Sequence, residues 1–355
     1  MSIADDTVAA GPARSAVPGA PRADMPGASR AATTGAARFW PGGLVVAGLW
    51  LAAAAGTALW PEVERAPYTD ELAALMGLVA AAVAVVALAG PKPGGPFLSG
   101  LSGKVRHAGP WLAVLALVFA AWEIVTAKLG LLPTPFFVPP QGLVEVYLDD
   151  WPRLGESLLA SLFLLASGYL FGAVAGFATG VAIGWSKAAG YWVHPVLRLV
   201  GPLPATAWLP LAFFLFPTSG SASTFLVALA TGFPVTVLTW SGIASVNRDF
   251  YDIARTLGAS ERFLILKVAI PAALPSVFVG LFMGLGASFA VLVVAEMLGV
   301  KAGLGWYLQW AQGWAAYANM YAALLVMALM CSGLVTVLFR LRDRTLSWQK
   351  GLVRW

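Results

Sequence analysis

Residues 274–295 read LPSVFVGLFMGLGASFAVLVVA, and this stretch contains no charged side chain. A helix needs about 20 apolar residues to cross the ~30 Å hydrocarbon core of a bilayer. The composition extends this pattern to the whole chain, since 59% of its 355 residues are hydrophobic and only 11% are charged. Soluble proteins carry about 25% charged residues. The sequence therefore predicts an all-α polytopic membrane protein.

Seven further apolar segments accompany this one, so eight membrane-spanning helices are predicted. Two short, Ala-rich segments precede a core of six. The two N-terminal segments are Gly43–Trp60 and Leu72–Ala89, and the other core segments are Trp111–Leu131, Leu158–Trp185, Val196–Phe216, Phe225–Ile243 and Met320–Phe339. The proline-rich residues 132–140 are not expected to be helical, because each proline favours extended neighbours. An outer helix is predicted after them, over Gly142–Leu154.

These segments divide the chain into five parts. Residues 1–41 are rich in Ala, Gly, Pro and Arg and are predicted to form a disordered cytoplasmic tail. Residues 42–90 hold the two extra transmembrane helices, and residues 91–110, rich in proline and glycine, are predicted to be a linker. The core occupies residues 111–345, and residues 346–355 form a second cytoplasmic tail.

The distribution of Lys and Arg predicts the orientation. If the N-terminus is cytoplasmic and all eight segments span, only Arg65, Lys128, Arg153 and Lys301 lie on the outer side. This asymmetry follows the positive-inside rule, so both termini are expected in the cytoplasm. The net charge of +5 is scattered over short loops between apolar segments, and no nucleic acid is expected as a partner.

Residues 247–275 form a long polar loop within the core. Asp249–Leu257 has the pattern of an amphipathic helix, with acids near its start, where they suit the helix dipole. Gly258 is placed as its C-terminal stop. A second short helix, Glu261–Ala269, is predicted to end at Pro271. A helical hairpin of this kind can dock into a groove on a partner protein.

The loop also carries a recognisable spacing, which is Asp252-x-Ala254-x-x-x-Gly258 followed by Val268-x-Ile270-Pro271. This spacing resembles the EAA loop of binding-protein-dependent ABC importer permeases, with conservative replacements at four positions. Residues 133–355 are similar to the nitrate/sulfonate/taurine type of these permeases almost end to end. The shared motifs are Leu132–Pro135, Pro202–Pro204, Leu209–Leu211, Ala273–Ser276, Ala295–Leu298 and Gly303–Gly305.

The resemblance implies the permease subunit of an ATP-driven importer in a bacterial inner membrane, for a small anion of the sulfonate, taurine, nitrate or bicarbonate class. The implied partners are a dimer of ABC ATPase subunits, a periplasmic or lipid-anchored substrate-binding protein, a second permease chain in a homodimer, and membrane lipid. By position, the resemblance assigns the ATPase contact to Asp252, Ala254, Arg255, Gly258 and Pro271.

ATP chemistry is expected elsewhere, because the chain lacks the G-x4-G-K-[ST] loop that cradles phosphates. ATP and Mg would then be bound by the ATPase subunit. No catalytic residue, metal site or cofactor is expected in this chain, which is interpreted as a transport subunit and not as an enzyme.

Two further sets of residues are candidates for mechanism. Five glycines at four-residue spacing predict close helix packing, either within one subunit or across an interface. They are Gly168, Gly172, Gly176, Gly180 and Gly184. Two acids, Glu123 and Glu296, fall in or beside apolar segments, where burying a charge is costly. Both are candidates for a pathway or gate; a structural role is favoured for Glu123, and an outer gate or the loop with Gly303 and Gly305 for Glu296.

Three alternatives stay open. An ion-coupled secondary transporter would need ionisable groups at the membrane midplane, and Glu123 alone is a candidate there. A membrane enzyme would need a metal cluster or a nucleophile with its base, and no such pattern is visible. An ABC permease for another small solute, such as an amino acid, is compatible with the loop motif.

Overall fold

The computed structural model describes residues 40–89 and 96–349, and its regular secondary structure within these ranges is helical. Seven helices are long and apolar enough to cross a membrane, and a bent pair adds an eighth if it forms one span. The all-α polytopic fold is therefore confirmed. Nearly all of the predicted N-terminal tail, the first part of the predicted linker and residues 350–355 lie outside the described residues.

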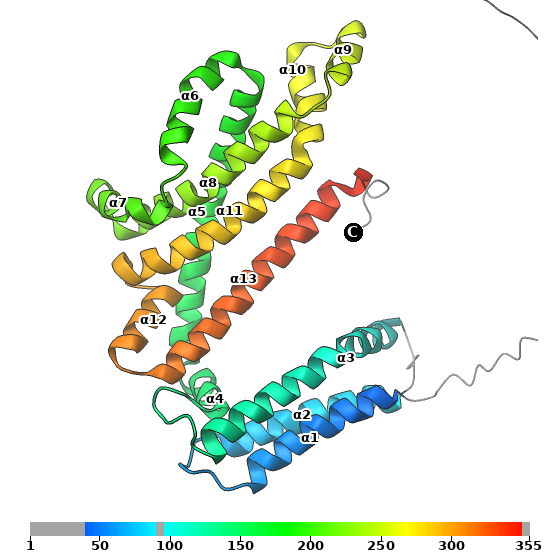
Figure 1. Ribbon diagram of the computed structural model, residues 1–355, viewed down its shortest axis with the longest axis vertical. Helices are drawn as coiled ribbons and strands as arrows, with labels where there is room; N and C mark the ends of the chain where they lie inside the picture. Colours follow the sequence, from blue (N-terminus) through cyan, green and yellow to red (C-terminus); the bar gives the residue numbers. More distant parts are fainter. Residues whose placement is uncertain (1–39, 90–95, 350–355) are drawn as a thin grey trace, which may run out of the picture.

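The N-terminal helices form a layer of three. Helices α1 (Pro41–Leu59), α2 (Thr69–Leu88) and α3 (Pro96–Glu123) pack side by side, as Figure 1 shows in blue and cyan. The α3 helix begins far earlier than expected, so residues 96–110 are helical and the predicted linker is wrong over this range. Pro96 can begin a helix without losing a hydrogen bond, because the first N–H groups of a helix have no partner within it.

The outer connection follows α3 and a π-helical turn, η1 (Ile124–Lys128). Residues 129–139 contain no helix, as their prolines predict. The outer helix α4 (Pro140–Asp149) then leads directly into α5 (Trp151–Trp185). The predicted helix, Gly142–Leu154, begins and ends later in the sequence than α4. Pro152 lies in the first turn of α5, where its missing N–H costs nothing, and this starts a new helix there.

The core is built around α8 (Ser219–Ala244), which packs against both α5 and α11 (Ile270–Gly299). Half of the apolar stretch of α8 is buried inside the chain, whereas 22% of the apolar stretch of α5 is buried. The side chains of Thr218 and Ser221 cap the start of α8 reciprocally. The remaining core helices, α12 (Leu304–Gly313) and α13 (Tyr317–Thr345), pack on each other and on α11.

The third core segment is broken, so the prediction of one apolar helix there is wrong. Helix α6 (Lys187–Val200) is followed by η2 (Ala205–Trp208) and α7 (Leu209–Leu215), and the two halves meet at a bend of 89°. Pro202 and Pro204 stand at the bend. Proline cannot donate a backbone hydrogen bond and disfavours helical geometry in the residue before it, which ends α6.

A helical hairpin joins α8 to α11. It consists of α9 (Arg248–Thr256), α10 (Glu261–Phe263) and the π-helical turn η3 (Leu264–Ala269). The expected break at Pro271 is absent, because η3 runs directly into α11 and the proline falls in the first turn of that helix. In Figure 1 the hairpin and the C-terminal end of α13 lie toward one side of the molecule, and α4 and α12 lie toward the other.

Candidate functional site

The hairpin, residues 247–269, is defined by local caps. The Asn247 side chain accepts a hydrogen bond from the Asp249 amide at 3.0 Å and starts α9. Gly258 has a φ of +81°, which a residue without a Cβ adopts at little cost. Its N–H donates to the Arg255 carbonyl at 2.9 Å and closes α9. These caps hold the turn between α9 and α10 without help from the membrane helices.

The hairpin exposes apolar side chains on an otherwise polar surface. Phe250 and Ile253 on α9, and Leu257 directly after it, are 58%, 59% and 83% exposed. Asp252 and Arg255 are exposed beside them, and Ala254 is half-buried. Apolar side chains grouped within a charged rim are typical of a protein interaction site. Four of the five residues assigned to ATPase contact therefore lie together on this short element.

Arg255 ties the two arms of the hairpin together. Its guanidinium lies 3.8 Å from the Asp252 carboxylate and 3.4 Å from that of Glu261. Exposed pairs of this kind stabilise by at most about 1 kcal/mol. The base of the hairpin is fixed by Tyr251, whose ring packs edge-on against Trp185 of α5 at 5.7 Å, and burial raises the pKa of Tyr251. The hairpin therefore contacts the end of α5 directly.

Pro271, the fifth assigned residue, lies inside the helical run that leaves the hairpin. The preceding turn is π-helical, with the Ile270 N–H donating to the Ile265 carbonyl. A wider turn of this kind absorbs a helix irregularity without breaking the helix. The residue therefore does not lie at the exposed tip but where the hairpin joins α11.

The five glycines of α5 face α8 within the same chain. A Cβ added to Gly172 would lie 2.3 Å from the Ala228 carbonyl oxygen, and one added to Gly176 would lie 2.6 Å from that of Gly232. Gly168, Gly180 and Gly184 meet α8 side chains equally closely. The backbones of α5 and α8 can approach this closely only because these positions carry no side chain. Of the two packing alternatives, the structure places the face inside one subunit.

Glu296 is fully buried near the C-terminal end of α11. Its carboxylate accepts hydrogen bonds from the Ser161 hydroxyl at 2.6 Å and from the Gly305 amide at 2.8 Å. Ser161 also accepts from the Leu304 amide at 2.7 Å. Gly303 approaches the carboxylate so closely that its absent Cβ would lie 2.4 Å from the Glu296 carboxyl carbon. Glu296 therefore joins α5, α11 and the start of α12.

Glu123, the last residue of α3, lies in a buried polar cluster. Its carboxylate is 3.6 Å from the Lys128 ammonium and accepts a hydrogen bond from the Gln141 amide at 2.7 Å. Lys128 donates to the carbonyls of Thr57 and Trp60 at the end of α1, both at 2.8 Å. These contacts engage Oε1, whereas the buried Oε2 has no hydrogen-bond partner among the described residues. The cluster attaches α1 to α3 and α4.

Glu62, in the loop between α1 and α2, completes this cluster. It accepts a hydrogen bond from Gln141 at 2.9 Å and lies 3.5 Å from Lys128. Burial alone would raise the pKa of Glu62, but hydrogen bonds from the Ala66 amide and the Thr69 hydroxyl, with the charge of Lys128, lower that pKa overall. The Glu62 side chain is therefore held as a carboxylate anion against the buried ammonium of Lys128, and this fixes the loop.

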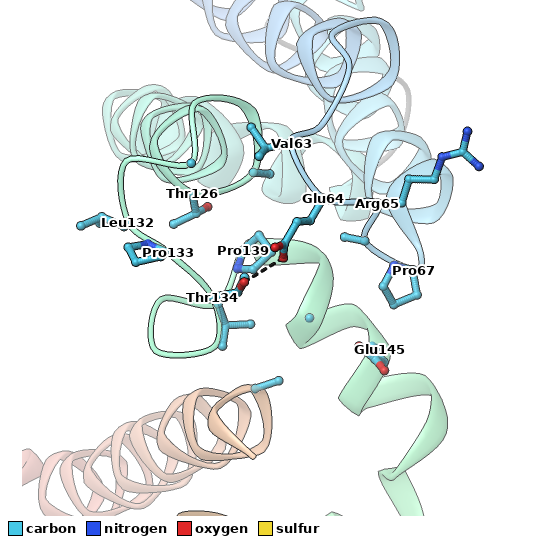
Figure 2. Close-up of a pocket in the computed structure, with 16 residues that line it drawn as sticks. Val63, Glu64, Arg65, Pro67, Thr126, Leu132, Pro133, Thr134, Pro139 and Glu145 are labelled. Atoms are coloured by element: carbon cyan, nitrogen blue, oxygen red, sulfur yellow. Dashed lines mark hydrogen bonds between the residues drawn. The ribbon is translucent and has the colours of Figure 1, made fainter. Parts of the chain in front are cut away.

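A cavity of about 410 Å³ lies beside this cluster, between the α1–α2 loop, residues 130–139 and α4. Figure 2 shows Glu64 pointing toward Thr134, whose hydroxyl donates to it at 2.8 Å, while Arg65 extends away from that pair. Glu145 of α4 also lines the cavity. The lining of this cavity thus includes two acids, Glu64 and Glu145, and one base, Arg65.

A second cavity, of about 570 Å³, lies within the core. It is lined by the bend after α6 and by the middle of α8 and α11, including Phe233, Leu238 and Met283. Its described lining contains no charged side chain, and Thr206 is a polar member of it. Such a cavity next to the broken third segment is a candidate stretch of a translocation pathway.

Several functional contacts were missed from the sequence. Lys128 was counted only as an outer charge, and Gln141 was not singled out. Polar contacts to Asp150, at the start of α5, were also missed. The Tyr307 hydroxyl of α12 donates to Asp150 at 2.6 Å, and the Asn319 amide of α13 donates to it at 3.2 Å. Burial and the neighbouring Asp150 raise the pKa of Tyr307. The available signal was the presence of polar residues at the outer ends of apolar segments.

The comparisons with known proteins cover the hairpin and much of the core. Residues 168–345 match the family described as binding-protein-dependent transport system inner membrane component. The nitrate import permease protein of Synechococcus elongatus is 30% identical over 70% of this chain and 91% of its own length. The putative aliphatic sulfonates transport permease protein of Bacillus subtilis is 27% identical over 70% of this chain and 91% of its own length. The bicarbonate transport system permease protein of Synechococcus elongatus is 30% identical over 56% of this chain and 67% of its own length.

Proposed function

This chain belongs to the family of binding-protein-dependent transport system inner membrane components, and from that premise we propose that it imports a small oxyanion. Members of this family are membrane permease subunits of ABC importers and not enzymes, and their general partners are ATPase and substrate-binding subunits. The proposal adds a substrate class, an assembly and a docking site for the ATPase.

The observation that carries the docking assignment is the hairpin. It presents Phe250, Ile253 and Leu257 outward on a capped helix, next to the charged pair Asp252 and Arg255. A groove on an ATPase could bury these three side chains, and each fully buried one would contribute about 1.5–3 kcal/mol. We therefore assign Asp252, Ala254, Arg255 and Gly258 to the docking surface, and Pro271 to the joint with α11.

The substrate class is proposed from the relatives. Their names assign them nitrate, aliphatic sulfonates and bicarbonate, which share a small, planar or tetrahedral oxyanion group. An anion of this kind, received from a binding protein on the outer side, would pass the cavity between the third-segment bend, α8 and α11. Nitrate, an alkanesulfonate and bicarbonate are accordingly the substrates to test first.

The assembly is proposed as two copies of this chain on two ATPase subunits, in a bacterial inner membrane with both termini in the cytoplasm. The hairpin and the end of α13 then face the cytoplasm, and α4, α12 and the α1–α2 loop face outward. Residues 42–90 form an additional pair of transmembrane helices outside the core of residues 111–345. Exposed apolar residues such as Phe163, Phe171 and Leu329 would contact lipid.

The test is uptake by the reconstituted complex. The tagged chain, its ATPase and its binding protein are placed in liposomes, and uptake of radiolabelled nitrate, taurine and bicarbonate is followed with and without ATP. The proposal expects ATP-dependent uptake of one of these anions and none of an uncharged solute of similar size. Uptake that needs an ion gradient but no ATP would overturn it in favour of a secondary transporter.

A further inference from the structure

A large pocket on the hairpin side of the core has an unusual set of charges. It has a volume of about 880 Å³ and is formed by the end of α5, by α6 and by the last turns of α8. Its lining includes three basic side chains, Lys187, His194 and Arg198. Among its described lining residues there is no carboxylate. The pocket is therefore basic, although the molecule also carries acids on this side, in the hairpin.

The basic groups of this pocket have no anionic partner. No carboxylate of the described residues lies within 4.0 Å of Lys187 or Arg198. Positive charges placed around one hollow repel each other unless an anion lies between them. A guanidinium and an ammonium also supply several N–H donors, which is the donor set that an oxyanion accepts most strongly.

Aromatic side chains form the wall behind these charges. The His194 ring packs edge-on against Trp240 of α8, with ring centres 4.4 Å apart. Phe233 and Trp185 line the same pocket. A basic rim over an aromatic wall suits an oxyanion that carries a small apolar body as well as a bare one.

The pocket lies between two other cavities. It shares Phe233 and Val237 with the apolar cavity in the middle of the core. It shares Gly184, Trp185 and Lys187 with a cavity of about 630 Å³ that borders the hairpin residues Tyr251 and Asp252. Three hollows thus follow one another from the middle of the core to the hairpin, and the basic one is the second.

Phe233 separates the apolar cavity from the basic one. Its ring fits against the bend that follows α6, where a Cβ on Gly201 would lie 2.4 Å from the ring. A solute moving from the apolar cavity toward the hairpin side would pass beside this ring, which lines both cavities, and would then meet Lys187, His194 and Arg198. The first charged groups that it meets on this route are positive.

We infer that this pocket is an oxyanion-binding site, on which an anion settles as it leaves the core on the ATPase side. The inference rests on the proposed function for the direction of travel, but not for the binding itself. The recognised group is a small oxyanion such as sulfate, nitrate or a sulfonate head. A lipid phosphate offers the same chemistry, and the experiment separates the two sources.

The experiment measures equilibrium binding of radiolabelled sulfate to the full-length chain in phosphatidylcholine nanodiscs, at constant ionic strength and without ATP. Wild-type protein should bind sulfate saturably. The double variant Lys187→Gln/Arg198→Gln should raise the dissociation constant by about tenfold or more, because it removes two charged hydrogen-bond donors. Arg198→Lys keeps the charge and should retain most of the binding.

The matched control is Arg340→Gln, which removes an exposed positive charge near the end of α13 on the same side of the molecule. It should bind sulfate as the wild type does. If sulfate binding weakens when phosphatidylglycerol is added, and only in proteins with intact Lys187 and Arg198, the site is supported and a lipid phosphate is its occupant. If phosphatidylglycerol has no effect, the free anion is the occupant.

Absence of saturable sulfate binding, or equal binding by wild type and the double variant, would overturn the inference. That failure is distinguishable from failure of the proposed function, because binding is measured without ATPase or ATP. A chain that drives ATP-dependent uptake but binds no sulfate here keeps its function and loses this site. A chain that binds sulfate here without ATP-dependent uptake keeps the site and loses the importer assignment.

Discussion

At the scale of single residues, Glu296 is held by a hydroxyl and a backbone amide, and no cation of the described residues lies within 4.0 Å of it. Replacing it by alanine leaves the Ser161 hydroxyl and the Gly305 amide without their acceptor. Each buried group left unsatisfied costs about 1–3 kcal/mol. We predict that Glu296→Ala lowers the melting temperature of the purified protein and loosens the start of α12.

The matched control for this variant is Glu156→Ala, which removes an exposed acid from the outer part of α5. Melting is followed in detergent, and exchange of the Leu304 and Gly305 amides is followed by mass spectrometry. If Glu296→Ala and Glu156→Ala have the same melting temperature and the same amide exchange, Glu296 does not hold the start of α12.

Lys128 is the second residue on which a local structure depends. Its buried ammonium meets two carbonyl groups of α1 and the carboxylates of Glu62 and Glu123. Removing one partner of a buried ion pair costs about 3–5 kcal/mol, because the remaining charges stay buried without compensation. We predict that Lys128→Met detaches the outer ends of α1 and α2 from α3 while the core stays folded.

Hydrogen exchange localises the effect of Lys128→Met, with Lys301→Met, an exposed outer lysine, as the control. Faster exchange should be confined to α1, α2 and the loop between them. Unchanged exchange there would show that apolar packing alone holds the pair.

At the scale of elements, the contact of α5 with α8 depends on glycine. In Gly176→Leu a side chain would have to occupy space where even a Cβ lies 2.6 Å from the Gly232 carbonyl oxygen. Overpacking of a close interface costs about 1–3 kcal/mol, and more where backbone blocks the way. We predict that Gly176→Leu prevents folding or assembly, and that Gly176→Ala gives a folded protein with a lower melting temperature.

Gly155 provides the control, since it lies on the same helix with no atom within 4 Å of its Cβ position. Gly155→Leu should give wild-type yield and melting. Equal behaviour of Gly155→Leu and Gly176→Leu would mean that the glycine face does not set the packing of α5.

The hairpin is the element that we expect to carry ATPase binding. Asp252→Lys reverses a charge on α9 and breaks its pair with Arg255, without touching a buried group. Since an exposed pair contributes at most about 1 kcal/mol to stability, the protein should stay folded. We predict that ATPase association and uptake fall while the yield and melting temperature of the permease do not.

Asp343→Lys is the charge-matched control, because Asp343 is also exposed and paired with a neighbouring arginine on the same side of the molecule. Gly258→Pro is a second variant of the hairpin, since proline cannot adopt a φ of +81° or donate the hydrogen bond that closes α9. Normal association and uptake in both hairpin variants would refute the docking assignment.

The elements that the sequence predicted well are those set by local patterns. The α9 helix and its stop at Gly258 follow from capping and amphipathic spacing. The bend of 89° in the third segment was missed, although Pro202 and Pro204 were visible, because an apolar stretch of the right length was read as one span. The continuity of η3 with α11 was missed because a π-helical turn accommodates Pro271, which sequence spacing alone does not reveal.

The candidate site could be predicted only where its members are close in sequence. The glycine face of α5 repeats every four residues, so its existence was predictable and its partner α8 was not. The cluster of Lys128 draws on Thr57, Glu62 and Gln141, which come from separate elements. Its assembly depends on how three helices pack, and no periodicity within one of them encodes it.

At the scale of the whole molecule, a continuous set of packed helices connects the hairpin to the core. The α10 helix and η3 continue into α11 without a break, and α11 packs along α8, which packs along α5. Tyr251 gives the hairpin a second contact, with Trp185 at the end of α5. We expect a displacement of the hairpin to reach both helices packed on α8, and so the cavity between α8, α11 and the bend.

The measurement that tests the central claim most directly is purification of the tagged wild-type chain from its native membrane in mild detergent, with mass spectrometry of the proteins that come with it. Our account predicts a P-loop ATPase near one copy per permease chain, and its loss with Asp252→Lys but not with Asp343→Lys. A chain that purifies alone and transports its solute in liposomes without ATP would contradict the account.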